Sequence, residues 1–411
     1  MPTNPSRYDR DSKEFLRRPR FHDLSAVRKF VIVGGATSVR DAFDAFGFTE
    51  GRGVFVKLDD LVKRQGAWIR GNGPDSDVVI SSRLRLARNI NGFPFASRAT
   101  AGDFQNIVKL AIDAASEVLP KDSFDVLNFP DYSRDDAIFL CERQLVSREF
   151  AENFVPRALV VDKNEEFALM INEEDHLLFQ MAASGLTLRK LWSEINELDD
   201  LFGQKLDYSF DEEFGYLTAD PANVGTGLHL SVMLHLPALV ETKEISRAMR
   251  SFAKINLAAG CAFGAEGRGY GEFFQIANQA TLGKSEETMI DRMKGIVDSV
   301  LNYERQARAA ILEKNRDGIL DRCYRALGTL QSARLASLEE TMQCLSSLRL
   351  GVELKLLPEI NGALVDELIQ RVQPAHLKKL AFLRGEDADD EDALRADYLR
   401  EKLAPVNRRA R

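Results

Sequence analysis

Alternating arginines follow an apolar run in Asp77-Val78-Val79-Ile80-Ser81-Ser82-Arg83-Leu84-Arg85-Leu86-Ala87-Arg88-Asn89. In an extended chain, side chains two residues apart point to the same face, so Arg83 and Arg85 share a face with Ser81. Planar guanidinium groups match the oxygens of a phosphate. The pattern predicts a strand that grips a polyanion. The alternative is a salt-bridged edge of a sheet.

Composition limits the possible classes of protein. The chain has 411 residues, a net charge of -8 and 45% hydrophobic residues. This length exceeds the usual single-core size, so more than one domain is expected. The acidic balance argues against a general nucleic-acid-binding protein. The four cysteines lack C-x-x-C spacing and fit a reducing cytoplasm, and we expect no structural metal site, no export signal and no membrane span.

Three regions follow one another along the chain. Residues 1–60 are predicted to form an N-terminal extension, a basic arm followed by a small strand-helix unit around Gly34-Gly35. Residues 61–310 mix strand-like runs at 136–140, 158–161, 167–171 and 229–234 with helices at 103–118 and 186–202. Ser285 is predicted to cap a helix that leads into the tail, and residues 311–411 are predicted to be an all-helical domain with a further cap at Ser337 and helices at 362–372 and 392–403. The fold class is therefore α+β.

Two further segments carry groups that suit chemistry. Ile171-Asn172-Glu173-Glu174-Asp175-His176 places three carboxylates and an imidazole directly after an apolar strand. Such acids can hold or deprotonate a cationic substrate, and the alternative is a polar turn with a structural histidine. The glycine- and hydroxyl-rich segment 215–228 would let backbone amides approach a ligand closely, although glycine loops are common.

Together with Gln275-Ile276-Ala277-Asn278-Gln279, these segments resemble the signature segments of the ATP:guanidino phosphotransferases, most closely the bacterial protein arginine kinases. The resemblance runs from about Trp68 to Leu403. It implies a large antiparallel β-sheet flanked by helices, ATP bound against that sheet, and phosphoryl transfer to the guanidinium group of a protein arginine.

The resemblance also implies roles for individual residues. Glu174 takes the place of the catalytic carboxylate, which orients the protonated guanidinium and accepts a proton. Arg83 and Arg85 would clasp the phosphates of Mg-ATP, the cofactor of an active protein. Three serines at the matching positions belong to the implied nucleotide site: Ser81, Ser82 and Ser231.

Several positions depart from the family pattern. Leu178, His229 and Gly260 stand where the family has arginines. Ala265, with Glu266 beside it, takes the place of a second catalytic glutamate, and Asp220 replaces a substrate-orienting cysteine. A charge-assisted hydrogen bond contributes roughly 1.5 to 3 kcal/mol, so three lost arginines remove about 4 to 9 kcal/mol from nucleotide or transition-state binding. That corresponds to roughly a thousandfold loss or more.

The helical tail shows a similar partial match. The family carries an Arg-Asp-x-x-Arg-Ala motif that binds phosphoarginine, and this chain has Glu391-Asp392-Ala393-Leu394-Arg395-Ala396. Asp392 and Arg395 are the candidate phosphoarginine-binding residues, while Glu391 would repel the phosphate. The alternative is an ordinary helix surface.

The sequence thus supports two hypotheses. The favoured one is a catalytically impaired cytoplasmic relative, without a cofactor, that acts by binding proteins: arginine-containing clients, an adaptor or an active kinase, with a homodimer possible. The alternative is an active protein arginine kinase that uses Mg-ATP. Neither hypothesis involves nucleic acid or a membrane.

Overall fold

The computed structural model describes residues 58–404 except 130, 266–267 and 387–389. The predicted basic arm and the strand-helix unit around Gly34-Gly35 lie outside these residues. No helix in the described range is long and apolar enough to cross a membrane.

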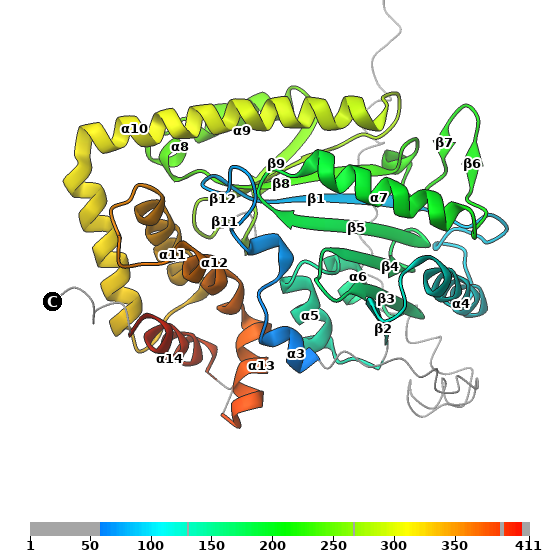
Figure 1. Cartoon of the computed structure of the whole chain (residues 1–411), viewed down its shortest axis with the longest axis horizontal. Coiled ribbons are helices and arrows are strands. Elements are labelled where there is room, and N and C mark those ends of the chain that lie inside the picture. The colour runs from blue at the N-terminus through cyan, green and yellow to red at the C-terminus, as the bar shows by residue number, and fades with distance from the viewer. Residues whose placement is uncertain (1–57, 130, 266–267, 387–389, 405–411) are drawn as a thin grey trace, which may run out of the picture. The chain divides into compact units, whose positions relative to one another are not determined.

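A single eight-stranded sheet forms the centre of the fold (Figure 1). Its strand order is β2-β3-β4-β5-β1-β8-β12-β9, and every neighbouring pair is antiparallel. The strands are β1 (Val79–Arg88), β2 (Phe124–Phe129), β3 (Arg157–Asp162), β4 (Phe167–Ile171), β5 (Leu177–Ser184), β8 (Leu228–His235), β9 (Leu257–Cys261) and β12 (Phe273–Asn278). Two small hairpins pair β6 (Phe210–Asp211) with β7 (Gly215–Tyr216) and β10 (Gly264–Ala265) with β11 (Arg268–Gly269). The large antiparallel sheet implied by the resemblance is confirmed.

Helices cover both faces of this sheet because strand side chains alternate between the faces. On one face, Leu84 and Leu86 of β1 pack in a core with α4 (Ala101–Val118), α7 (Leu188–Gly203), α9 (Ile245–Ala253) and the first half of α10 (Glu286–Ser332). On the other face, Ala87 and Leu178 pack with α3 (Leu58–Val62), α5 (Arg134–Glu142) and α6 (Arg148–Glu152). The short elements are η1 (Ala67–Ile69), η2 (Pro221–Asn223) and α8 (Pro237–Glu241).

One predicted strand is wrong. Residues 136–140 lie in α5, not in the sheet. The hydroxyl of Ser133 accepts from the backbone N–H of Asp136, and the Asp136 carboxylate accepts from the Ser133 N–H, which is a complete capping box. These reciprocal bonds start a helix and outweigh the strand-like apolar run that follows. The strands predicted at 158–161, 167–171 and 229–234 and the helices at 103–118 and 186–202 are confirmed, with small shifts at their ends.

The C-terminal part of the described chain is helical, as expected. It contains the second half of α10, then α11 (Leu338–Glu353), α12 (Gly362–Arg371), α13 (Pro374–Arg384) and α14 (Glu391–Leu403), around a second apolar core. Ser285 and Ser337 cap α10 and α11. α10 contains a residue with non-helical backbone angles, Asn315. In Figure 1 this long helix bends toward the tail helices. The domain boundary proposed at 310/311 lies near this break and stays a prediction.

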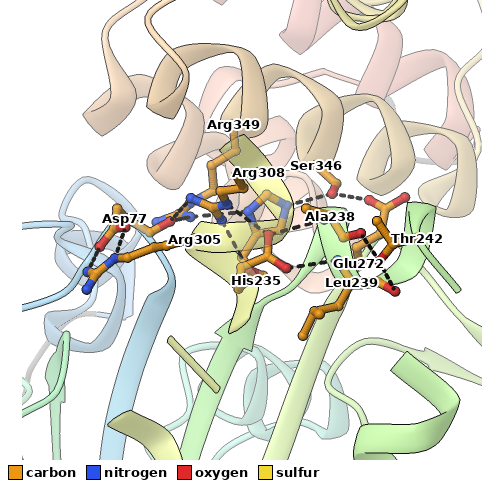
Figure 2. Close-up of polar contacts among 11 residues, drawn as sticks. Asp77, His235, Ala238, Leu239, Thr242, Glu272, Arg305, Arg308, Ser346 and Arg349 are labelled. Atoms are coloured by element: carbon orange, nitrogen blue, oxygen red, sulfur yellow. Dashed lines mark hydrogen bonds and ion pairs between the residues drawn. The ribbon is translucent and has the colours of Figure 1, made fainter. Parts of the chain in front are cut away.

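Arg349 joins the helical part to the sheet through a buried polar network (Figure 2). Its side chain, 2% exposed, donates to the Asp366 carboxylate at 3.0 Å, to the backbone carbonyl of Asp77 at 3.0 Å and to that of Ser76. Its Nη1 also faces Nδ1 of His235 at 3.3 Å. One guanidinium therefore holds α11 against both α12 and the chain that enters β1.

His235, at the end of β8, is the centre of the same network. Its Nε2 lies 2.7 Å from the Ser346 hydroxyl, which itself donates to the Glu272 carboxylate. Ser346 must then accept from His235, so the proton sits on Nε2 and Nδ1 is free to accept from Arg349. Burial lowers the pKa of His235 well below its usual value, and the charge of Arg349 lowers it further. The imidazole is neutral at pH 7.

Candidate active site

Arg83 and Arg85 lie in the middle of the sheet, because β1 has β5 on one side and β8 on the other. The register places Arg83 opposite Ser231 and Arg85 opposite Gln180. Arg83 Nε donates to Ser231 Oγ at 3.2 Å, and Arg85 Nε donates to Gln180 Oε1 at 2.8 Å. Within the described chain neither guanidinium forms an ion pair with a carboxylate. The alternative of a salt-bridged sheet edge is therefore wrong.

The two guanidinium groups form a cationic pair that no carboxylate of the described residues contacts as an ion pair, although Glu173 acts on Arg85 from a greater distance. Burial lowers the pKa of Arg83 to about 9, and the neighbouring charge of Arg85 contributes. Burial also lowers the pKa of Arg85, while Glu173 opposes the shift. Partly buried cations that lack an anionic partner are costly unless a ligand supplies the opposite charge. This arrangement suits a phosphate or another polyanion.

The three positions that lack the family's arginines supply no positive charge. Leu178 is 7% exposed and packs in the core under α5 and α6. His229 donates from Nε2 to Asn223 Oδ1 at 2.6 Å, and burial, followed by the charge of Arg85, lowers its pKa to about 4. It is therefore neutral at pH 7. Gly260 lies exposed on β9, and a Cβ atom there would meet no atom within 4 Å.

The acidic segment 172–176 forms the turn between β4 and β5, and its Asp175 and His176 are held by structural partners. The Asp175 carboxylate, 2% exposed, accepts from Asn89 Nδ2 and from the backbone N–H of Ala219, each at 2.7 Å. The buried His176 accepts at Nδ1 from the backbone N–H of Ile90 at 3.0 Å. For Asp175 and His176, the alternative of a polar turn with structural side chains is therefore correct.

Glu174 is the carboxylate of this turn that is free to act on a ligand. Glu173 accepts from the Ser147 hydroxyl and from the Glu174 backbone N–H, each at 2.5 Å. The Glu174 carboxylate has no hydrogen bond or ion pair to any described group. Partial burial, followed by repulsion from Asp220 and Glu173, raises its pKa to about 7. A carboxylate with this pKa can both hold a cation and accept a proton near neutral pH.

Asp220 faces the same region from the glycine-rich loop. Its Oδ1 accepts from the Ala222 N–H at 2.9 Å at the start of η2, which leaves the second oxygen without a described partner. Gly225 adopts a φ of +111°, and a Cβ atom there would lie 2.9 Å from the Thr281 carbonyl oxygen. The loop can adopt this conformation because residue 225 is a glycine, which tolerates the positive φ and the close approach to Thr281. Asp220 and Glu174 together offer two negative charges to a guanidinium.

The pKa of Glu174 predicts a pH-dependent affinity for arginine. A guanidinium stays protonated, so binding strengthens as Glu174 loses its proton. Because a group with a pKa of about 7 is roughly one-eleventh ionised at pH 6 and ten-elevenths ionised at pH 8, we expect affinity for an arginine peptide to rise up to about tenfold between these pH values. Fluorescence anisotropy measures this profile. Glu174→Gln should flatten it, and a wild-type profile that stays level or falls would contradict the role of Glu174.

The other predicted site residues do not all lie on the face of Arg83. Ser81 is buried on the face of Arg83. Ser82 lies on the opposite face, donates to the Gly185 carbonyl at 2.8 Å and accepts from the Thr187 N–H at 3.1 Å, so its hydroxyl is already used beside α7. Ala265 lies in β10, and the adjacent Glu266 is outside the described residues.

In the tail, Arg395 is 1% exposed and is not part of an open helix surface. It donates to the carbonyls of Val372 at 2.9 Å and Ala336 at 2.7 Å, and to the Asp392 carboxylate at 2.6 Å. These bonds fix α14 to the chain ahead of α11 and to the end of α12. Phosphoarginine binding by Asp392 and Arg395 stays a prediction, and it would have to displace these contacts.

Two residues of the site were not predicted. Gln180 connects Arg85 to the Gln144 carbonyl, to which it donates at 2.6 Å. Asn89 Nδ2 donates to the Asp175 carboxylate at 2.7 Å and to the Leu217 carbonyl at 3.0 Å. Gln180 could have been found from the sequence, because side chains two residues apart in a strand share a face and Gln180 follows Leu178 by two. Nothing local in the sequence distinguishes Asn89.

Comparisons with known proteins agree with this geometry. Residues 104–307 match the model of the ATP:guanido phosphotransferase C-terminal catalytic domain, and residues 316–411 match that of the protein-arginine kinase McsB C-terminal domain. The protein-arginine kinase of Symbiobacterium thermophilum is 37% identical over 356 residues, which cover 84% of this chain and 99% of that protein. The chain belongs to the protein-arginine kinase family. The family member of Halothermothrix orenii is 35% identical over 85% of this chain and 99% of its own length.

Solved structures support the fold of this family member. A lombricine kinase superposes with a TM-score of 0.52 at 20% identity, covering 58% of this chain and 70% of that one. The duplicated taurocyamine kinase of Schistosoma mansoni, with bound transition-state-analogue components, gives a TM-score of 0.51 at 21% identity, covering 73% of this chain and 43% of that one. The protein-arginine kinase family uses ATP, typically with magnesium.

Proposed function

We propose that this member of the protein-arginine kinase family has strongly impaired phosphoryl transfer and acts by binding arginine-containing proteins. The observation that carries the proposal is the loss of three positive charges where the family has arginines. Leu178 is apolar, His229 is neutral at pH 7 and Gly260 has no side chain. The acids that would face a guanidinium, Glu174 and Asp220, are present. The substrate side of the site is thus better preserved than the nucleotide side.

Mg-ATP fits this site only in part. Arg83 and Arg85 are suited to hold phosphate oxygens, with Ser231 and Gln180 orienting them. ATP would supply the phosphoryl group. Holding its roughly four negative charges requires more partners than two guanidinium groups and a magnesium ion. At roughly 1.5 to 3 kcal/mol for each charge-assisted bond, three missing contacts weaken nucleotide or transition-state binding by roughly a thousandfold or more.

The binding partner is expected to be a protein with an accessible arginine. Glu174 and Asp220 approach the region from different loops, so a planar guanidinium can bridge them with paired N–H donors. A client protein satisfies this chemistry most simply. An adaptor, an active kinase or a second copy of this chain are the other partners that pull-down and sedimentation measurements would reveal.

One observation favours the second candidate function, an active protein arginine kinase. Arg83 and Arg85 lack counter-ions, and Glu174 has a pKa near 7, which suits a catalytic base. Both features are compatible with a slow reaction that a bound nucleotide would still permit.

Incubation with Mg-ATP and an arginine-rich protein separates the two functions. Phosphoarginine is measured by mass spectrometry, beside the Symbiobacterium thermophilum relative as the reference enzyme. We expect a rate at least about a thousandfold below the reference, because of the missing arginines, together with measurable binding of the arginine-rich protein. A rate within about tenfold of the reference, abolished by Glu174→Gln, would establish the active kinase instead.

A further inference from the structure

The β6–β7 hairpin exposes aromatic rings that the folded chain does not cover. Phe210 is 59% exposed and Phe214 is 48% exposed. The hairpin extends from the end of the sheet in Figure 1. We call its aromatic and acidic side chains the hairpin surface, which comprises Asp207, Tyr208, Phe210, Asp211, Glu212, Glu213, Phe214 and Tyr216. Exposed rings of this size are characteristic of a contact surface.

A groove of about 500 Å³ lies between this hairpin and the C-terminal end of α7. Its lining combines rings with carboxylates: Asp199, Asp200, Asp207, Tyr208, Phe210 and Tyr216. Glu212 and Glu213 at the hairpin tip are exposed and form no ion pair within the described chain. The groove thus combines aromatic rings with the carboxylates of Asp200 and Asp207 beside the Arg88-paired Asp199, and the tip adds Glu212 and Glu213.

The rings of this surface already hold one guanidinium. The Arg88 guanidinium carbon lies 3.5 Å from the centroid of the Tyr216 ring, and its Nη2 pairs with Asp199 at 2.7 Å. Phe210 packs edge-on against Tyr216 with ring centroids 5.2 Å apart. Arg88 is buried and belongs to the fold, but it demonstrates the chemistry: a ring and a carboxylate side by side accept a guanidinium or ammonium group. The exposed ring of Phe210 and the carboxylates of Glu212 and Glu213, which form no ion pair with a described residue, present the same two kinds of partner, a ring and a carboxylate, to solvent.

Backbone hydrogen bonds fix this surface to the acidic turn. The Ser209 N–H donates to the Asn89 carbonyl at 2.8 Å, and the Leu217 N–H donates to the Ser209 carbonyl at 2.9 Å. Asn89 in turn holds Asp175, next to Glu174. The Tyr216 N–H donates to the Gly225 carbonyl at 2.9 Å, which ties the hairpin to the loop of Asp220. These bonds attach the hairpin to both segments that carry the candidate guanidinium ligands, Glu174 and Asp220.

We propose that the hairpin surface binds a lysine- or arginine-bearing segment of the client protein, next to the arginine that Glu174 and Asp220 receive. This inference rests on the proposed function and specifies its partner as a basic protein segment. Charge complementarity selects this occupant, because carboxylates flank the rings and Lys205, two residues before Asp207, is already paired with Glu117 at 2.7 Å. Rings give contact area, and carboxylates exclude acidic segments.

Fluorescence anisotropy with three labelled peptides tests the proposal without requiring catalysis. Each peptide carries one central arginine, flanked on both sides by lysines, glutamines or glutamates. We expect the lysine peptide to bind at least about tenfold more tightly than the glutamine peptide at low salt, and the glutamate peptide to bind most weakly. The preference should shrink as salt rises, because the charges are exposed.

Two hairpin variants and one control locate the effect. Glu212→Gln with Glu213→Gln, and Phe210→Ser with Phe214→Ser, should each reduce lysine-peptide affinity roughly fivefold or more and leave glutamine-peptide affinity nearly unchanged. Glu313→Gln with Asp317→Asn removes two exposed acids of α10 and should have no effect. Equal affinity for all three peptides, or hairpin variants that match the control, would overturn the inference. Phosphoarginine formation on the same peptides is a separate readout. Rapid phosphorylation would refute the proposed function, and the absence of a lysine preference in binding would refute this inference, each independently of the other.

Discussion

Replacement of Arg349 by methionine is expected to lower the free energy of unfolding by about 3 to 5 kcal/mol. Arg349 is 2% exposed and is the ion-pair partner of Asp366, which is itself 6% exposed. The variant leaves that carboxylate buried without its cation, leaves the Ser76 carbonyl without its Arg349 donor and leaves the Asp77 carbonyl with Arg308 as its remaining guanidinium donor. Urea denaturation followed by circular dichroism measures the change.

Arg305→Met is the matched control for that prediction. Arg305 also binds the 75–77 segment, through Asp75 at 2.8 Å and through Asp77, but its side chain is 41% exposed. Exposed pairs contribute about 0 to 1 kcal/mol, so this substitution should change stability little. Equal effects of the two substitutions would show that the buried network in Figure 2 does not hold the helical part to the sheet.

Restoration of three arginines, Leu178→Arg, His229→Arg and Gly260→Arg, is expected to raise Mg-ATP affinity by at least about a hundredfold. Each guanidinium would add a charge-assisted bond to phosphate oxygens on the face that Arg83 and Arg85 already occupy. The gain is set below the sum of the three contacts because neighbouring charges are not additive and because Leu178 lies in a packed core. Isothermal titration calorimetry measures the affinity.

Single variants show which position matters. Gly260→Arg should be the best tolerated, because the site is exposed and open. Gly295→Arg on α10 is the control, since a Cβ atom there also meets nothing within 4 Å and the position belongs to a different surface. A triple variant that binds Mg-ATP no better than this control would mean that the missing cations are not the defect.

Much of the sheet and its cationic face could be predicted from the sequence. The alternation in β1 has a period of two, and this local pattern survives folding, so Arg83 and Arg85 fall on one face as expected. The strand predicted at 136–140 failed for a local reason as well, because the capping box of Ser133 and Asp136 carried more weight than the apolar residues after it.

The roles within the acidic turn and the tail could not be read from the sequence. Asp175 is held by Asn89, 86 positions earlier, and by Ala219, 44 positions later, so its burial is a product of tertiary structure. Arg395 finds its carbonyl partners at Ala336 and Val372, 59 and 23 residues away. A motif shows which side chains are present. It does not show which of them the fold has already satisfied, and here that distinction separates Glu174 from its neighbours.

Calorimetric titration of the wild-type protein with Mg-ATP tests the central claim, that this nucleotide face has too few cations, most directly. We predict no saturable binding below about the millimolar range, because Leu178, His229 and Gly260 replace three of the family's arginines and leave Arg83 and Arg85 on this face. A micromolar dissociation constant for the wild-type protein would contradict the account.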